Sequence, residues 1–334
     1  MATHNGKREV VVVTGAGAGL GRAIVRAFAS QGADVALIAR DRERLEAAAG
    51  EVERAGGRAL VLPLDVADAE AVEAAAGLIE EQLGPIDIWV NNAMASIFSP
   101  VRQMTPEGYK RVTEVTYLGY VYGTLAALKR MAPRDKGVIV QVGSALAYRG
   151  IPLQSAYCAA KHAIQGFHDS LRSELIHDKS NIKVTMVQMP ALNTPQFRWV
   201  KSRLPNEAQP VPPIFQPEVG ARAVVWAARH PRKELYVGWP TVQAIVGDKI
   251  VSSFVDHYLA NKAYAGQQTD EERDPERPHN VWEPVEGDQA AHGVFDQKAK
   301  GWSGQFWFTT NRNWIMAAAG AGLAALGGAV LWKK

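Results

Sequence analysis

Cysteine is almost absent from the sequence, since Cys158 is the single one among 334 residues. One cysteine excludes an internal disulfide and every metal site that needs a cysteine cluster, and it is typical of a reducing compartment. The histidine and acidic residues show no metal-ligand spacing either, so we expect no metal site. The first residues contain no apolar run, and a secretory signal is therefore not expected.

The net charge of the sequence is also small. The formal net charge is +3, and no basic stripe with interleaved aromatic residues is present, so a nucleic-acid partner is not expected. Apolar residues, in contrast, make up 47% of the sequence, which is ample for a buried core. A length of 334 residues is long for one α/β domain and indicates a domain plus an extension.

Short apolar runs alternate with segments of helical periodicity along most of the chain. This alternation predicts an α/β fold, a doubly wound parallel sheet of the Rossmann type in a single domain, with helices on both faces. Strands are expected at 9–14, 34–39, 59–64, 86–91, 137–143, 182–188 and 234–238. Helices are expected at about 19–31, 41–55, 68–83, 104–131, 155–178 and 217–229.

A glycine-rich turn joins the first expected strand to the first expected helix. Its sequence is Gly15-Ala-Gly-Ala-Gly-Leu-Gly21. Glycines let the backbone approach a pyrophosphate closely, and the free N–H groups and dipole of the following helix favour negative charge. A plain tight turn is the alternative, but it needs fewer glycines. The segment therefore predicts a dinucleotide-phosphate cradle.

Tyr157 and Lys161 are four residues apart on the helix expected at 155–178, and Ser144 lies thirteen residues before the tyrosine. A helix places positions i and i+4 on one face, so the lysine can lie beside the phenol and lower its pKa. Such a phenol is a candidate general acid/base, with the serine hydroxyl bonded to the reacting oxygen. Taken alone, the spacing is also common on solvated helix faces.

Four motifs in this order resemble the classical short-chain dehydrogenase/reductase family over roughly residues 7–240. They are Thr14-Gly-x-x-x-Gly19-x-Gly21, Asn91-Asn92-Ala93, Ser144 and Tyr157-x-x-x-Lys161. The resemblance implies an oxidoreductase that interconverts a carbonyl and an alcohol with a nicotinamide dinucleotide. It also implies that Lys161 binds the nicotinamide ribose, and that the protein is a homodimer or homotetramer packed through the helices at 104–131 and 155–178.

The residue pattern after the second strand bears on the cofactor. An acid at the strand end bonds the ribose 2′-hydroxyl of NAD, whereas an arginine nearby accommodates the 2′-phosphate of NADP. Here Ala39 occupies the acid position and Arg40 follows it. NADP(H) is therefore preferred, while Asp41 keeps NAD(H) possible, and Arg40 could also be an ordinary surface arginine.

The resemblance transfers further cofactor contacts to this chain. Asp65 corresponds to the adenine contact, although it could instead cap the next helix, for which Asp68 is better placed. Thr194 corresponds to the residue that bonds the nicotinamide carboxamide. The full predicted cofactor set is Thr14, Gly15, Gly19, Leu20, Gly21, Arg40, Asp65, Val66, Asn92, Tyr157, Lys161, Pro190 and Thr194.

Three positions depart from the family pattern. Met94 stands where glycine is usual, and Ala191 replaces the glycine after Pro190. Thr116 stands where the family has a catalytic asparagine that helps to hold a water in a proton relay behind the lysine. Its hydroxyl and carbonyl could carry an altered relay, so we count Thr116 with Ser144, Tyr157 and Lys161. The departures also allow a rival hypothesis, a catalytically weak cofactor-binding scaffold.

Residues 192–216 fall where the family carries its substrate lid. Phe197, Trp199 and Phe215 would suit an apolar substrate there, or could equally serve to pack the lid.

The C-terminal part predicts a different environment. We expect the catalytic domain at 7–260, a polar linker or extension at 261–312, and a transmembrane anchor at 313–334. Trp314 to Trp332 is a run of 19 uncharged residues with tryptophans at both ends, followed by two lysines. A soluble helix at an oligomer interface is the alternative. A membrane anchor, with the catalytic domain in the cytoplasm, would suit a lipophilic carbonyl or alcohol substrate.

Overall fold

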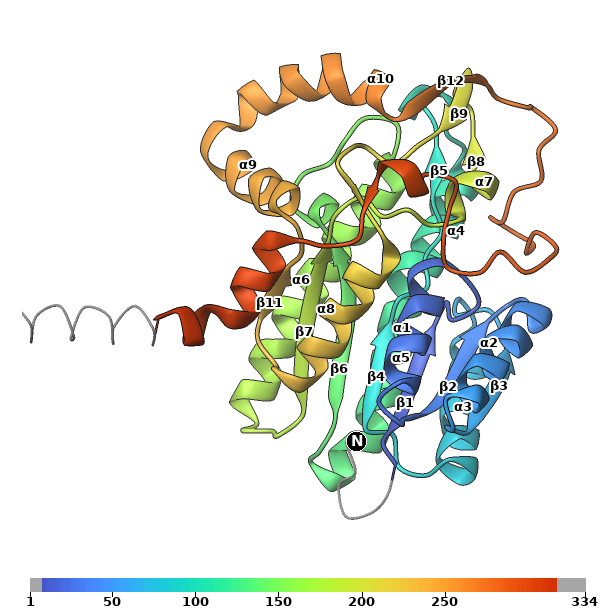
Figure 1. Ribbon diagram of the computed structural model, residues 1–334, viewed down its shortest axis with the longest axis vertical. Helices are drawn as coiled ribbons and strands as arrows, with labels where there is room; N and C mark the ends of the chain where they lie inside the picture. Colours follow the sequence, from blue (N-terminus) through green and yellow to red (C-terminus); the bar gives the residue numbers. More distant parts are fainter. Residues whose placement is uncertain (1–7, 317–334) are drawn as a thin grey trace, which may run out of the picture.

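Seven parallel strands form the central sheet of the computed structural model, which describes residues 8–316 (Figure 1). The strand order is β11-β7-β6-β4-β1-β2-β3. The order reverses on either side of β1, as in a doubly wound fold, and all seven expected strands are confirmed. Their bounds are β1 Val10–Thr14, β2 Asp34–Ala39, β3 Ala59–Pro63, β4 Ile88–Asn91, β6 Val138–Ser144, β7 Lys183–Met189 and β11 Glu234–Tyr236.

Helices cover both faces of this sheet. One face carries α1 (Gly19–Ala29), α2 (Arg42–Arg54) and α8 (Pro217–Arg229), and the other carries α3 (Ala69–Gln82), α5 (Gly119–Met131) and α6 (Ser155–His177). The helix expected at 104–131 is divided into α4 (Pro106–Thr113), a π-helical turn Glu114–Leu118 and α5. Asp68, and not Asp65, caps α3 by accepting a hydrogen bond from the Ala71 N–H at 3.0 Å.

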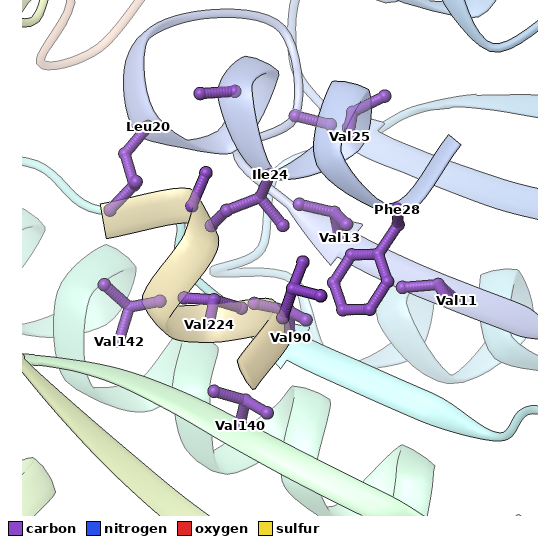
Figure 2. Close-up of a cluster of buried hydrophobic side chains, with 14 of the residues drawn as sticks. Val11, Val13, Leu20, Ile24, Val25, Phe28, Val90, Val140, Val142 and Val224 are labelled. Atoms are coloured by element: carbon purple, nitrogen blue, oxygen red, sulfur yellow. The ribbon is translucent and has the colours of Figure 1, made fainter. Parts of the chain in front are cut away.

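The strand interiors are apolar on both faces because both faces are covered. In β1, Val11 and Val13 belong to the core beneath α1 and α8, whereas Val10 and Val12 belong to the core on the other face. Figure 2 shows the first of these cores, where side chains from strands and helices interlock. The continuous run of valines therefore reflects burial on two sides, as expected for a parallel strand.

A third layer of short elements lies over the carboxyl ends of the strands (Figure 1). It contains three two-stranded pairs, β10 with β13, β12 with β9, and β5 with β8. Its helix α9 was not predicted from the sequence. The bounds are β5 Ile97–Phe98, α7 Gln196–Trp199, β8 Lys201–Ser202, β9 Asn206–Ala208, β10 Ile214–Phe215, α9 Trp239–Tyr258, α10 Tyr264–Gly266, β12 Gln268–Glu272 and β13 Ala299–Lys300.

The polar segment expected to be a linker packs against the catalytic domain instead. Val281, Ala291 and Phe295 are buried, and β12 and β13 pair with strands of the lid region. Composition suggested a linker because charge and proline dominate the segment. The structure differs because arginine side chains of the domain satisfy the backbone carbonyls of this segment. The domain boundaries at 260 and 312 stay a prediction.

The helix that begins at residue 304 continues to residue 316, the last described residue. Among the helices of residues 8–316, none is both long enough and apolar enough to cross a membrane. The predicted anchor at 313–334 lies outside the described residues except for its first four positions.

Candidate active site

A cavity of about 1020 Å³ lies at the carboxyl edge of the sheet, beside the point where the strand order reverses. This is the position at which open α/β sheets bind their ligands. The glycine turn, the ends of β4, β6 and β7, the lid and the C-terminal extension all line it. Every predicted site residue lines this cavity except Thr14 and Thr116.

The glycine turn is shaped so that side chains would not fit in it. Gly15 has a φ of 67°, and a Cβ there would lie 2.9 Å from the Ala93 Cα. A Cβ on Gly21 would lie 2.0 Å from the Gly15 carbonyl oxygen. Gly19 and Leu20 are the first two residues of α1, and both line the cavity. Because the glycines leave the backbone of the turn uncovered on the cavity side, the turn fits a pyrophosphate.

Thr14 and Asn92 support the turn from beneath. The Thr14 Oγ1 accepts hydrogen bonds from the N–H groups of Asn92 at 2.9 Å and Ala93 at 3.1 Å. The Asn92 Nδ2 donates back to the Thr14 carbonyl at 2.9 Å. These bonds tie the ends of β1 and β4 together, so Thr14 acts by holding the turn and not by lining the cavity.

Ser144, Tyr157 and Lys161 meet at one wall of the cavity. Ser144 ends β6, and its Oγ accepts a hydrogen bond from the Leu146 N–H at 3.1 Å. Tyr157 and Lys161 lie in the first turns of α6, on one face of the helix as their spacing predicts. The three side chains therefore combine a proton donor, a cation and a hydroxyl at the cavity surface.

The Lys161 ammonium is buried and has no acidic partner among residues 8–316. Its Nζ donates to the Val142 carbonyl at 2.7 Å and to the Tyr120 hydroxyl at 3.2 Å. The Tyr120 hydroxyl donates to the same carbonyl at 3.0 Å. Burial lowers the pKa of Lys161 to about 7, because the charged form loses its hydration.

The expected drop in the pKa of Tyr157 is not found. Burial raises the pKa of Tyr157 above its usual value, and only a hydrogen bond to Ser144 lowers it. The reason is geometric, since the Lys161 Nζ lies 5.6 Å from the centre of the Tyr157 ring and donates its hydrogen bonds elsewhere. Tyr157 therefore keeps its proton at neutral pH and can donate it.

Thr116 does not reach Lys161. Thr116 lies in the π-helical turn. Its hydroxyl accepts a hydrogen bond from the Ala95 N–H and donates one to the Ala95 carbonyl, both at 2.9 Å. The Thr116 hydroxyl therefore makes no direct contact with Lys161, and its part in a water-mediated relay stays a prediction. The hydroxyl that touches Lys161 belongs to Tyr120, which the sequence reasoning missed although it lies one helical turn after Thr116.

Beside the end of β2, the cavity is closed by residues from the C-terminal part of the chain. Arg40 donates hydrogen bonds to the backbone carbonyls of Asn280, Val281 and Trp282. Arg111 donates its Nε to the Val281 carbonyl at 2.9 Å, and its Nη2 bonds the Asp65 carboxylate.

A second arginine continues this wall. Arg44 donates to the carbonyls of Val285 and Gly287, and its guanidinium lies 4.6 Å from the centre of the Trp199 ring. The Ala290 carbonyl accepts from the Gly19 N–H at 2.9 Å. We name residues 280–293 the C-terminal strap. The sequence contains little signal for it, because its bonds to Arg40, Arg44, Arg111 and Gly19 are made by backbone carbonyls.

The lid closes the other side of the cavity. Phe197 packs edge-to-face against Phe98 at 6.1 Å and Phe295 at 6.0 Å, and Trp199 and Phe215 are also buried. All three lid aromatics also line the cavity, so they both pack the lid and give the cavity an apolar surface.

Two of the residues that depart from the family pattern, Met94 and Ala191, line the cavity. Thr194 lies beside Gly19, where a Cβ on the glycine would be 3.2 Å from the Thr194 Cβ. Pro190 lines the cavity as well, and the two unusual residues Met94 and Ala191 affect its shape directly.

Comparisons with known proteins agree with this geometry. The family model for short chain dehydrogenases matches residues 9–204. An uncharacterized oxidoreductase, YxnA of Bacillus subtilis, is 32% identical over 325 residues, 96% of this chain and 90% of that protein, so the match includes the extension.

A fatty acyl-CoA reductase of Acinetobacter baylyi is 30% identical over 67% of this chain and 74% of its own. A solved alcohol dehydrogenase of Thermococcus sibiricus, complexed with 5-hydroxy-NADP, is 28% identical with a TM-score of 0.60, over 69% of this chain and 96% of that one. That structure therefore has a similar fold.

Proposed function

The chain belongs to the short-chain dehydrogenase/reductase family, and from this premise we propose that it is an NADP(H)-dependent enzyme that interconverts a carbonyl and an alcohol on a lipophilic substrate. The observation that carries the proposal is that Ser144, Tyr157 and Lys161 line the same cavity as the glycine turn. A cavity with a phosphate cradle, a proton donor and a hydroxyl has the parts that carbonyl reduction needs.

The bound dinucleotide would supply the hydride for reduction. Tyr157 would donate the phenolic proton to the substrate oxygen as charge develops there. Burial raises the pKa of Tyr157, so the phenol is protonated at neutral pH and can act as the acid in carbonyl reduction. Ser144 would donate a hydrogen bond to the same oxygen and stabilise its developing charge.

Lys161 would hold the nicotinamide ribose through its ammonium group. Tyr120 and the Val142 carbonyl fix the ammonium in place. A lysine with a pKa of about 7 carries its charge on only part of the molecules at neutral pH. Activity should therefore fall as the pH rises through this value.

Two features support NADP(H) over NAD(H). The end of β2 presents Ala39 to the cavity instead of an acid that could bond a ribose 2′-hydroxyl. Arg40 and Arg44 lie beside it, with neutral backbone carbonyls among their partners. Donors that the strap does not use remain on both guanidinium groups, so a 2′-phosphate could bond them.

The apolar lid aromatics support a lipophilic substrate. Two relatives are named for lipid chemistry, the fatty acyl-CoA reductase above and a 3-dehydrosphinganine reductase of Danio rerio, which is 34% identical over 64% of this chain. We also propose that residues 313–334 anchor the protein to a membrane, with the catalytic domain on the cytoplasmic side. A homodimer or homotetramer stays a prediction of the family resemblance.

An activity screen tests this function. The full-length protein in detergent is assayed for oxidation of NADPH and NADH with fatty aldehydes of increasing chain length and with ring ketones. We expect turnover with NADPH that increases with substrate length. Tight NADPH binding without turnover on any carbonyl would instead favour the scaffold hypothesis.

A further inference from the structure

Large apolar side chains are exposed on one side of the molecule. They come from α9 and from the last described segment, whose helix spans 304–316, and their exposed fractions range from 45 to 74%. They are Trp239, Val246, Ile250, Trp302, Trp307 and Phe308. We name this set the aromatic face. Scattered exposed apolar residues are normal, but a set that includes three tryptophans indicates an interaction surface.

The six side chains share one side of the fold. Trp239, Val246 and Ile250 are seven and four residues apart, which places them on one stripe of α9. The Gln305 Nε2 donates to the Tyr236 carbonyl at 3.2 Å, which holds the 304–316 helix beside the start of α9. Figure 1 shows both helices on the same side of the sheet.

The aromatic face borders the mouth of the active-site cavity. Trp239 and Trp302 line the cavity and are also 60% and 62% exposed, so each belongs to both surfaces. Tyr258, near the end of α9, lines the cavity and is exposed in the same way. A substrate that enters past these rings therefore passes over an apolar rim.

The chain itself indicates what covers this face. The 304–316 helix leads directly into the apolar run from Trp314 to Trp332, which is 19 residues without a charge. Tryptophan is enriched at membrane–water interfaces because its ring is apolar and its N–H remains hydrated. The predicted anchor would therefore bring the aromatic face to the surface of the same bilayer.

We propose that the aromatic face rests on a lipid bilayer, so that the cavity mouth opens against the lipid and the substrate enters from the membrane phase. This inference deepens the proposed function and rests on it for the lipophilic substrate. The anchor would supply attachment, and the face would supply orientation.

Hydrogen exchange tests the surface without any catalytic readout. Backbone amide exchange of the full-length protein is measured with and without phosphatidylcholine vesicles. We expect the amides of α9 and of residues 304–308 to exchange about tenfold more slowly on vesicles, whereas the last turns of α6 do not change. If the protein binds the vesicles but the exchange of the α9 amides does not change, the proposal is overturned, because the anchor alone would then account for binding.

Two matched variants link the surface to substrate delivery. The Ile250→Ser/Trp307→Ser variant removes one exposed apolar side chain from each helix of the face, and neither residue lines the cavity. The Val101→Ser/Val294→Ser variant removes two side chains of similar exposure outside the aromatic face and the cavity. We expect the first variant to lose the exchange protection and about tenfold in kcat/KM for a long-chain carbonyl in vesicles, with a short soluble carbonyl unaffected. The second variant should match the wild type.

The outcomes separate this inference from the proposed function. Protection of α9 on vesicles without turnover on any carbonyl would leave the surface standing and remove the function. Protection of α9 in vesicle-free solution that disappears on dilution would overturn the surface proposal, because a second copy of the chain would then cover the face.

Discussion

The two walls of the cavity are built in different ways. The motif wall, made of the glycine turn with Ser144, Tyr157 and Lys161, comes from short stretches that follow strands of the central sheet. The covering wall, made of the lid and the C-terminal strap, depends on contacts between distant parts of the chain. Arg40 and Trp282, for example, are 242 positions apart.

The two walls therefore have different roles. The motif wall carries the groups that move protons, and the buried core on both faces of the sheet supports it. The covering wall is held by arginines of the domain, whose partners in the strap are mostly backbone carbonyl oxygens, and it lies beside the end of β2. Loss of the Tyr157 proton donor from the motif wall should therefore abolish chemistry and spare cofactor binding, while damage to the covering wall should weaken cofactor binding and spare chemistry.

The largest effect is expected from Tyr157→Phe, which removes the proton donor of the motif wall. We expect kcat to fall by about 10²- to 10⁴-fold, because no other hydroxyl with a donatable proton replaces it. The dissociation constant for NADPH, measured by fluorescence titration, should stay within about threefold of the wild type. Retained turnover in this variant would contradict the role of Tyr157.

Arg111→Leu tests the covering wall. Arg111 is buried and connects the Asp65 carboxylate to the Val281 carbonyl, so its loss frees the strap and leaves a carboxylate without its cation. We expect NADPH to bind about ten- to a hundredfold more weakly, with little change in kcat at saturating cofactor.

The matched control for this prediction is Arg102→Leu, which changes an exposed arginine outside the cavity. Its NADPH affinity should equal that of the wild type. A loss of kcat as large as the loss of affinity in Arg111→Leu would show that the two walls do not act separately.

Tyr120→Phe sharpens the comparison within the motif wall. The variant removes a hydrogen-bond acceptor from the Lys161 ammonium, which disfavours the charged form and lowers the pKa of Lys161 further below 7. The basic limb of the pH profile of kcat/KM for NADPH should move by about one unit to lower pH. Tyr117→Phe, in the same apolar cluster, is the control. A uniformly lower profile with an unmoved limb would mean that Tyr120 is only structural.

The smallest effect is expected at the end of the strap. His292 bonds Glu218 at 2.8 Å and Asp296 at 2.9 Å. Burial alone would lower the pKa of His292, but these two carboxylates raise it above its usual value. The stability that comes from the raised pKa of His292 is fully present below the pKa of an unfolded histidine, about 6.5. It is lost as the pH rises through the pKa of His292 in the folded protein.

His292→Gln should therefore lower the melting temperature at pH 6 and have less effect at alkaline pH. Because the side chain is 40% exposed, solvent screening limits the difference to below about 1 kcal/mol. Thermal unfolding of both proteins across this pH range measures it. A deficit that grows with pH would contradict the assigned ion pairs.

Sequence periodicity predicted the seven strands of the sheet because inner strands such as β1, β2 and β4 are buried on both faces and are largely apolar. The edge strands β3 and β11 are only partly buried. The sequence also placed the glycine turn and the Tyr157–Lys161 pair, since both depend on residue identity and helix geometry. Family correspondence could not show that the Thr116 hydroxyl bonds the Ala95 backbone. Helix α9 was missed because its sequence has little amphipathic contrast.

By itself, the sequence determined the sheet, the phosphate cradle and the three polar groups of the motif wall, because these follow from side-chain chemistry at short spacing. Only the tertiary structure decided that Tyr120 holds Lys161, that Tyr157 keeps its proton, and that the strap closes the cavity beside the end of β2. The physical reason is that the arginines of the domain bind the strap largely through backbone carbonyls, which every residue possesses. In addition, pKa values depend on burial, which arises only when distant segments pack together.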